Sequence, residues 1–158
     1  MFNVINNFID NEHLFFIQKI ISSVNFPWFI VNQNPFILSH KIIDKVDNKI
    51  SINSDFFQPI TEDIIKKLKV EKINFCQLSL FTNNKSQREI PNRLDLENFC
   101  LNNKAVFFIN SSNGYVETLE SKLEAVENRV LIFDRRTPFK IHTQTDTNYM
   151  VILEIDYL

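Results

Sequence analysis

The chain has 158 residues, 44% of them hydrophobic and 13% aromatic, which is enough material for a single globular domain over residues 1–158 with its own core. Seventeen basic and nineteen acidic side chains give a net charge of −2, so no positive surface for a polyanion is expected and nucleic acid is excluded as a partner. No apolar run approaches the roughly 18 residues of a membrane span, and the N-terminus lacks the basic start of a signal peptide. We therefore expect no membrane partner and a cytoplasmic location.

Glycine and cysteine usage excludes further classes of site. Gly114 is the only glycine, and Cys76 and Cys100 are the only cysteines. P-loops, dinucleotide-binding turns and serine nucleophile elbows need several glycines, because the backbone must turn sharply or approach phosphate closely. Two cysteines without a CxxC pair indicate neither a disulfide framework nor a thiolate zinc site.

The first 70 residues predict short strands and two helices. Alternating or β-branched stretches predict strands in residues 1–9, 26–31 and 36–43. A polar turn is expected at 47–49. Apolar residues at helical spacing predict one helix over about 12–23, capped by Asp10 or Asn11, and a second over 61–70, opened by Pro59 and Thr61.

From residue 71 the pattern changes to strands. They are predicted at residues 72–81, 105–110, 115–119, 129–134 and 150–158. The pair Asn113–Gly114 is typical of a type I′ hairpin turn, which would join 105–110 to 115–119. Propensity alone would make 116–127 helical, but the hairpin favours two short strands broken near Glu120–Ser121. The polar stretch 82–104 is long for a loop, and such loops are often functional.

This order of elements predicts a mainly β fold with flanking α-helices, a β-sandwich or jelly roll. Five sequence segments carry more specific information than this order of elements. They are Asn25-Phe26-Pro27-Trp28, Ser39-His40, VFFINSSNGY at 106–115, ENRVLIFDRRTPF at 127–139 and TQTDT at 143–147. In these segments the chain resembles the small 2-oxoglutarate/Fe(II)-dependent oxygenases of the prolyl-4-hydroxylase-like group found in marine bacteria and phages. The resemblance implies a cupin-like double-stranded β-helix whose mouth holds iron and 2-oxoglutarate.

The family's functional residues are missing at the matching positions. Such enzymes bind Fe(II) through an H-x-D motif and a distal His, and a later basic residue binds the far carboxylate of 2-oxoglutarate. The H-x-D motif falls on Arg93-Leu94-Asp95, the distal His on Phe139 and the basic residue on Tyr149. A guanidinium has no lone pair for iron, so we expect Arg93 to pair with Asp95 near the Phe139 ring, without a metal.

These substitutions predict a catalytically inactive relative with no cofactor, kept as a structural or binding protein and, if a phage encodes it, as a virion or assembly component. A protein partner or a homo-oligomer is expected. One alternative is an active dioxygenase that uses Fe(II) and 2-oxoglutarate through a divergent site of Asp95 and His142. Another is a cupin-like protein that binds a small molecule, without metal, in the mouth of the same jelly roll. His142 lies three residues from position 139 and should face away from it on a regular strand. His13 and His40 are more typical of surface or packing residues.

Overall fold

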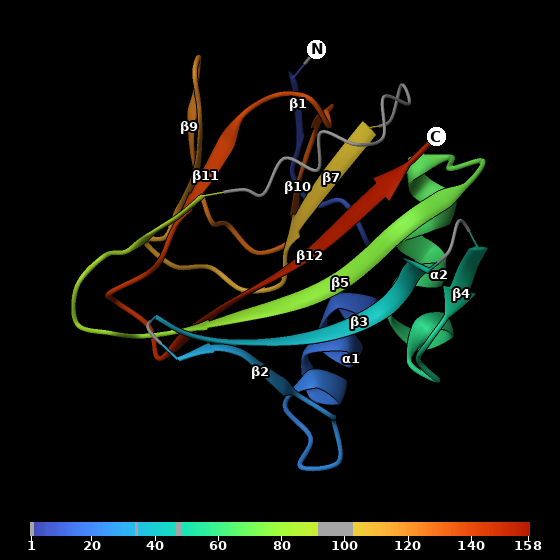
Figure 1. Ribbon diagram of the computed structural model, residues 1–158, viewed down its shortest axis with the longest axis horizontal. Coiled ribbons are helices and arrows are strands. Elements are labelled where there is room, and N and C mark those ends of the chain that lie inside the picture. The colour runs from blue at the N-terminus through green and yellow to red at the C-terminus, as the bar shows by residue number, and fades with distance from the viewer. Residues whose placement is uncertain (1, 34, 47–48, 92–102) are drawn as a thin grey trace.

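The computed structural model describes residues 2–33, 35–46, 49–91 and 103–158 (Figure 1). The two helices are α1 (Asn11–Ile21) and α2 (Phe57–Leu68). The main sheet contains β1 (Phe2–Ile5), β2 (Phe29–Gln33), β3 (Phe36–Val46), β4 (Lys49–Ile52), β5 (Ile73–Thr82), β7 (Asn103–Phe108), β10 (Arg129–Asp134) and β12 (Tyr149–Tyr157). The minor sheet contains β6 (Glu89–Pro91), β8 (Tyr115–Thr118), β9 (Lys122–Glu124) and β11 (Phe139–His142).

Both sheets are antiparallel. The main sheet runs β1-β10-β7-β12-β5-β3-β2, with β4 also paired to β3, and the minor sheet runs β6-β11-β8-β9. Strand β12 lies at the centre of the main sheet, between β5 and β7. Strands that are distant in sequence, such as β1 and β10, therefore lie side by side (Figure 1).

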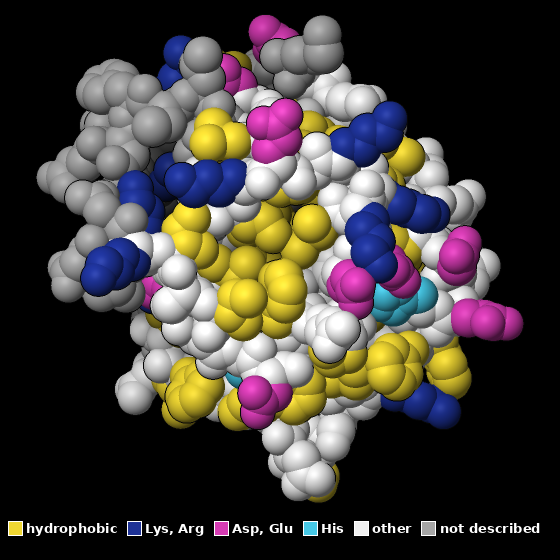
Figure 2. All heavy atoms as spheres, turned by 90° about the vertical axis from the view of Figure 1, so that its right-hand side faces the viewer, with side chains coloured by type: hydrophobic (Ala, Val, Ile, Leu, Met, Phe, Trp, Pro, Cys, Tyr) yellow, Lys and Arg dark blue, Asp and Glu magenta, His cyan; other side chains and the backbone are white. Residues whose placement is uncertain are grey.

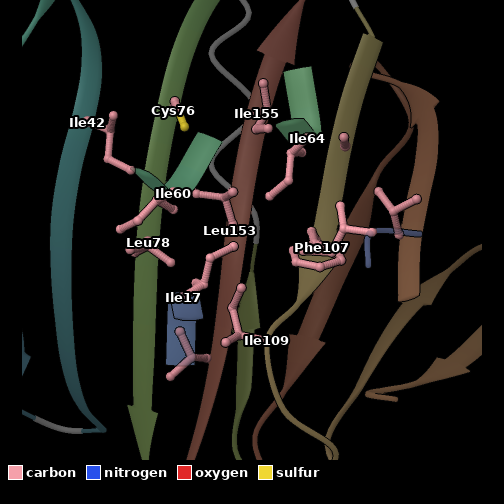
Figure 3. Packing of buried hydrophobic residues seen from close by; sticks show 14 of the residues in the cluster. Ile17, Ile42, Ile60, Ile64, Cys76, Leu78, Phe107, Ile109, Leu153 and Ile155 are labelled. Atoms are coloured by element: carbon pink, nitrogen blue, oxygen red, sulfur yellow. The ribbon is translucent and has the colours of Figure 1, made fainter. Parts of the chain in front are cut away.

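Two cores lie on opposite faces of the main sheet. The first packs α1 and α2 against it through Ile17, Ile60 and Ile64, which meet Leu153 and Ile155 among others (Figure 3). The second lies between the two sheets and draws Val106, Phe108, Leu131, Met150 and Ile152 from the main sheet and Val116, Phe139 and Ile141 from the minor sheet. Because side chains alternate along a strand, β12 supplies odd-numbered residues to the first core and even-numbered residues to the second.

The predicted fold class is confirmed, since two facing antiparallel sheets with helices on one side form a jelly roll. Residues 116–127 contain no helix. They form β8 and β9 with a break at 119–121, as the sequence predicts. Strand β12 and helix α1 also begin and end within two residues of their predicted bounds.

The predicted hairpin at Asn113–Gly114 is wrong. Strand β7 belongs to the main sheet and β8 to the minor sheet, so the segment between them crosses from one sheet to the other. Gly114 does not have a positive φ, and Asn113 is not among the described residues that do, so the turn is not type I′. A glycine fits here without displacing its neighbours, because a Cβ at 114 would lie 2.5 Å from Met150 Sδ and 3.0 Å from the His142 carbonyl oxygen.

Several elements differ from their predicted bounds. Helix α2 begins at Phe57, so Pro59 lies in its first turn, where a missing N–H costs no hydrogen bond. Strand β2 starts later than predicted, after Pro27. Strands β4 and β11 were not predicted. Within the predicted loop 82–104 the structure places β6 and the start of β7.

The surface view in Figure 2 faces the side on which α2 and β4 lie in Figure 1. Hydrophobic side chains gather in the middle of this face, and charged side chains lie around them. Neither of the two described helices is long and apolar enough to cross a membrane.

Candidate functional site

Charged side chains meet inside the sandwich at the end where β12 finishes. The even-numbered residues of β12 face the space between the sheets, and the last two of them are Glu154 and Asp156 rather than apolar residues. With Lys104, Arg135 and Phe139 they form a cluster that we call the barrel mouth. Phe139 closes this end of the core, and the charges lie beside it.

Lys104 is the central cation of the barrel mouth. It lies on β7 opposite Asp156 in the β7–β12 register, so its side chain shares the inner face with the two carboxylates. Its Nζ atom is 2.8 Å from Asp156 Oδ1 and 3.4 Å from Glu154 Oε1. The Lys104 side chain is only 6% exposed, so this is a buried ion pair with little access to solvent.

Asp156 is shared between two cations. Its Oδ1 atom faces Lys104, and its Oδ2 atom lies 3.2 Å from Nε of Arg135, just after β10. Together with Glu154, the described residues of the cluster carry two positive and two negative charges. The buried charges therefore compensate one another, as burial requires.

Phe139 forms the apolar wall of the barrel mouth. Its ring packs edge-on against Phe133 with centroids 5.1 Å apart, and Lys104 Nζ lies 5.7 Å from the Phe139 centroid. This places the ammonium within range of a cation–π contact. The position that the resemblance assigns to a metal ligand thus holds a buried ring beside a buried cation.

The electrostatics keep Lys104 charged. Burial by itself would lower the pKa of the ammonium, but the carboxylates of Glu154 and Asp156 outweigh burial and hold this pKa above its ordinary value. The Arg135 guanidinium has hydrogen-bond donors and no lone pair to offer. Neither cation of the barrel mouth can therefore act as a base or donate a lone pair.

The other residues singled out in the sequence do not join this cluster. Arg93 and Asp95 lie outside the described residues, so their expected pairing stays a prediction. Tyr149 begins β12, at the opposite end of the strand from Asp156, and is 43% exposed. Its odd number places its side chain on the face of β12 away from the minor sheet.

All three histidines of the chain lie elsewhere. His142 is on the outer face of β11, 2.7 Å from Glu117 and stacked on Tyr115. The ring nitrogens of His40 lie 2.8 Å from the Pro27 carbonyl oxygen and 2.7 Å from Ser54 Oγ. His13 Nδ1 lies 2.6 Å from Asp63 and links α1 to α2. Each imidazole already has partners, which is typical of structural histidines.

Comparison with solved structures identifies the fold. The chain is similar to a 2OG-Fe(II) oxygenase family oxidoreductase from Burkholderia pseudomallei (TM-score 0.68, 12% identity, 99% of this chain and 83% of the other). It is also similar to a prolyl hydroxylase from Trichoplax adhaerens, with a TM-score of 0.66 and 11% identity over 99% of this chain and 83% of the other. A prolyl-4-hydroxylase from Pseudomonas putida matches with a TM-score of 0.67 and 9% identity over 99% of this chain and 91% of the other. No protein-family model and no curated protein matches the chain.

The fold is thus the double-stranded β-helix of the 2-oxoglutarate oxygenases, in its prolyl-4-hydroxylase-like form. This corrects the expectation that no cofactor belongs with the chain. One of the similar structures is described as a 2OG-Fe(II) oxygenase and another as a non-heme alpha-ketoglutarate-dependent epimerase, so the comparisons point to Fe(II) and 2-oxoglutarate.

The donor set of the barrel mouth does not fit the iron of this fold. A facial triad needs two histidines and a carboxylate, and every histidine of the chain is engaged away from the barrel mouth. Within residues 2–33, 35–46, 49–91 and 103–158, no three His, Cys, Asp or Glu side chains are grouped to hold a metal ion. The cations Lys104 and Arg135 stand beside the carboxylates instead.

The charge cluster was missed in the sequence, although a signal for it exists. The closing strand reads MVILEIDYL, in which Glu154 and Asp156 interrupt an apolar run at a spacing of two. Two acids on one face of a buried strand predict buried cations opposite them. Which cations these are depends on the β7–β12 register, which only the folded chain reveals.

Proposed function

We propose that the chain is a non-catalytic protein of the 2-oxoglutarate oxygenase fold that serves as a binding or structural domain, such as a virion or assembly component. The observation that carries the proposal is the barrel mouth, where Lys104 and Arg135 neutralise Glu154 and Asp156. This end of the barrel has no open coordination site among its described residues. It holds ion pairs whose charges cancel, beside the buried ring of Phe139. Jelly rolls are a recurrent fold of structural and binding domains.

Electrostatics support this reading. A divalent cation at the barrel mouth would have to displace the Lys104 ammonium, which is held 2.8 Å from Asp156 and stays charged. It would also face repulsion from Arg135. The carboxylates are used by the protein's own cations, and no imidazole is available as a further ligand.

Turnover of 2-oxoglutarate tests the proposal. The purified chain is supplied with Fe(II), 2-oxoglutarate, ascorbate and oxygen, succinate is measured, and iron content is determined after desalting. We expect no succinate above the protein-free control. The Pseudomonas putida prolyl-4-hydroxylase, assayed with its own substrate, shows that the conditions support catalysis. Succinate formation with one bound iron per chain would refute the proposal.

The alternative function is an active 2-oxoglutarate/Fe(II)-dependent dioxygenase with a divergent metal site, which the comparisons favour because they point to both cofactors. In that case Arg135 and Lys104 are the cations that the described barrel mouth offers to the carboxylates of 2-oxoglutarate. Arg135→Gln should then raise the KM for 2-oxoglutarate, whereas Lys140→Gln, at an exposed position on the outer face of β11, should leave it unchanged.

A further inference from the structure

The outer edge of the main sheet is formed by two strands in line. Strand β3 pairs with β5 on one side, and its other side carries β2 at one end and β4 at the other. Leu38 pairs with both β2 and β5, and Ile43 pairs with both β4 and β5, so β2 and β4 lie on the same side of β3. Among the described residues, each of these two strands pairs only with β3.

This edge is exposed and apolar. Every residue of β2 and β4 is exposed. Its large hydrophobic side chains, which we call the apolar edge, are Phe29, Ile30, Val31, Ile50 and Ile52. Val31 is 63% exposed, in a chain that buries Ile17 and Ile42 completely. Isolated exposed apolar residues are ordinary, but a row of them along one sheet edge is typical of an interaction surface.

The charged side chains that usually protect a sheet edge are missing over β2. Natural edge strands carry charged residues, above all lysine, that prevent pairing with another chain. Between Lys19 and Lys41 the sequence has no Asp, Glu, Lys or Arg, and β2 lies within this stretch. A partner surface that meets β2 should therefore be apolar and uncharged as well, and β2 itself is such a surface. Two copies brought together by a two-fold axis would place no like charges opposite each other at β2.

We propose that the apolar edge is a homodimer interface in which the β2 edges of two copies of this chain meet around a two-fold axis. The exposed parts of the five side chains amount to on the order of 500 Å² per copy and lie on both faces of the edge. A contact that wraps around the edge would therefore use an area comparable to the apolar share of a standard interface of about 800 Å² per partner. The partner is a second copy, because the contact is self-complementary. The proposal is independent of the proposed function, since an active enzyme could dimerise through the same edge.

The bulge in β2 determines how the two copies meet. The β2–β3 register passes from Ile30 to Asn32 and skips Val31. A bulge shortens the length over which a strand can pair regularly with a further strand. The contact is therefore carried mainly by the apolar side chains rather than by a long ladder of main-chain hydrogen bonds.

Sedimentation velocity over a range of concentrations tests the proposal. We expect the wild-type chain to be a dimer at micromolar concentration. Ile30→Lys places a charge opposite its own copy and should raise the dissociation constant at least about tenfold. Ile52→Lys, at the other end of the same edge, serves as a second variant and should also weaken the dimer.

Leu119→Lys is the matched control, because Leu119 is 88% exposed in the connection between β8 and β9, away from this edge. It should leave the dissociation constant unchanged, and circular dichroism should show that all variants are folded. A monomeric wild-type chain, a dimer that survives both edge substitutions, or a dimer weakened equally by Leu119→Lys would overturn the proposal. Because the readout is mass rather than turnover, its failure is distinct from failure of the proposed function.

Discussion

Asp156 links the charges of the barrel mouth, since each of its carboxylate oxygens faces a different cation. Lys104 in turn faces two carboxylates, so no charge of the cluster stands alone. A compensated network of this kind stabilises little relative to an apolar core, but removing one member leaves an uncompensated charge in a buried place. The cost of a substitution here therefore depends on which charges remain.

The first prediction is that Lys104→Ala lowers the free energy of unfolding by about 3–5 kcal/mol. Of the cations in the described part of the chain, Glu154 then loses its partner and Asp156 keeps only Arg135. The double variant Lys104→Met/Glu154→Leu leaves the Asp156–Arg135 pair in place and should lose clearly less. Urea denaturation monitored by circular dichroism measures both. The idea fails if the double variant is as unstable as Lys104→Ala. Lys140→Ala, which breaks an exposed pair with Glu89, should hardly move the midpoint.

At the scale of elements, the connection from β7 to β8 joins the two sheets and is packed against β12. Asn113 fixes it to the segment before β12: its N–H lies 3.0 Å from the Asp146 carboxylate, and its side-chain oxygen accepts a hydrogen bond from the Thr145 N–H at 2.8 Å. Gly114 lies at the point of closest approach, against the Met150 sulfur. The lack of a side chain, rather than a positive φ, favours glycine there.

The second prediction follows from this close approach. Gly114→Ala should destabilise the chain by about 1–3 kcal/mol, because the new methyl group overlaps Met150 Sδ and the His142 carbonyl. In the Met150→Ala background, which removes the sulfur, the added cost of Gly114→Ala should be smaller. Thermal unfolding of the four members of this cycle measures the coupling. Additive effects would show that the sulfur is not the obstacle.

For the whole molecule, the central strands of the main sheet serve both cores, so opening either core disrupts the same sheet. Cys76 is one of the side chains that only such an opening would expose, because it lies fully buried on β5 against the helix layer. Burial, with a smaller contribution from Asp156 and Glu154, raises the pKa of its thiol far above the ordinary 9.0. The thiol can therefore ionise only when the sheet opens.

The third prediction concerns stability at alkaline pH. The folded thiol stays protonated while the unfolded thiol loses its proton above about pH 9, so the unfolded state binds fewer protons and stability falls as pH rises. Between pH 9 and 10 the slope should approach about 1.4 kcal/mol per pH unit for one group. Cys76→Ala should flatten this slope while lowering stability by a constant amount. Equal slopes in both chains would contradict it. Tyr157 and Lys104 contribute only from about pH 10 upward.

The sequence alone determined the local elements and the class of fold. Alternation and helical spacing are properties of neighbouring residues, so α1, β10 and β12 could be predicted, and so could the two short strands at 115–124. The resemblance also places Phe139 where the family has a metal ligand, and this assignment stays a prediction. The local view failed at Asn113–Gly114, where a good hairpin signal is overridden by packing against Met150.

Only the tertiary structure decided which strands share a sheet and which charges meet. Lys104 and Asp156 come together because β7 and β12 pair in one register, and a shift of one residue would turn Lys104 to the helix side. Likewise, β2 and β4 form one edge only because both pair with β3. Such pairings depend on contacts between residues far apart in the chain, whose free energy exists only once the sheet is assembled, and no local pattern encodes them.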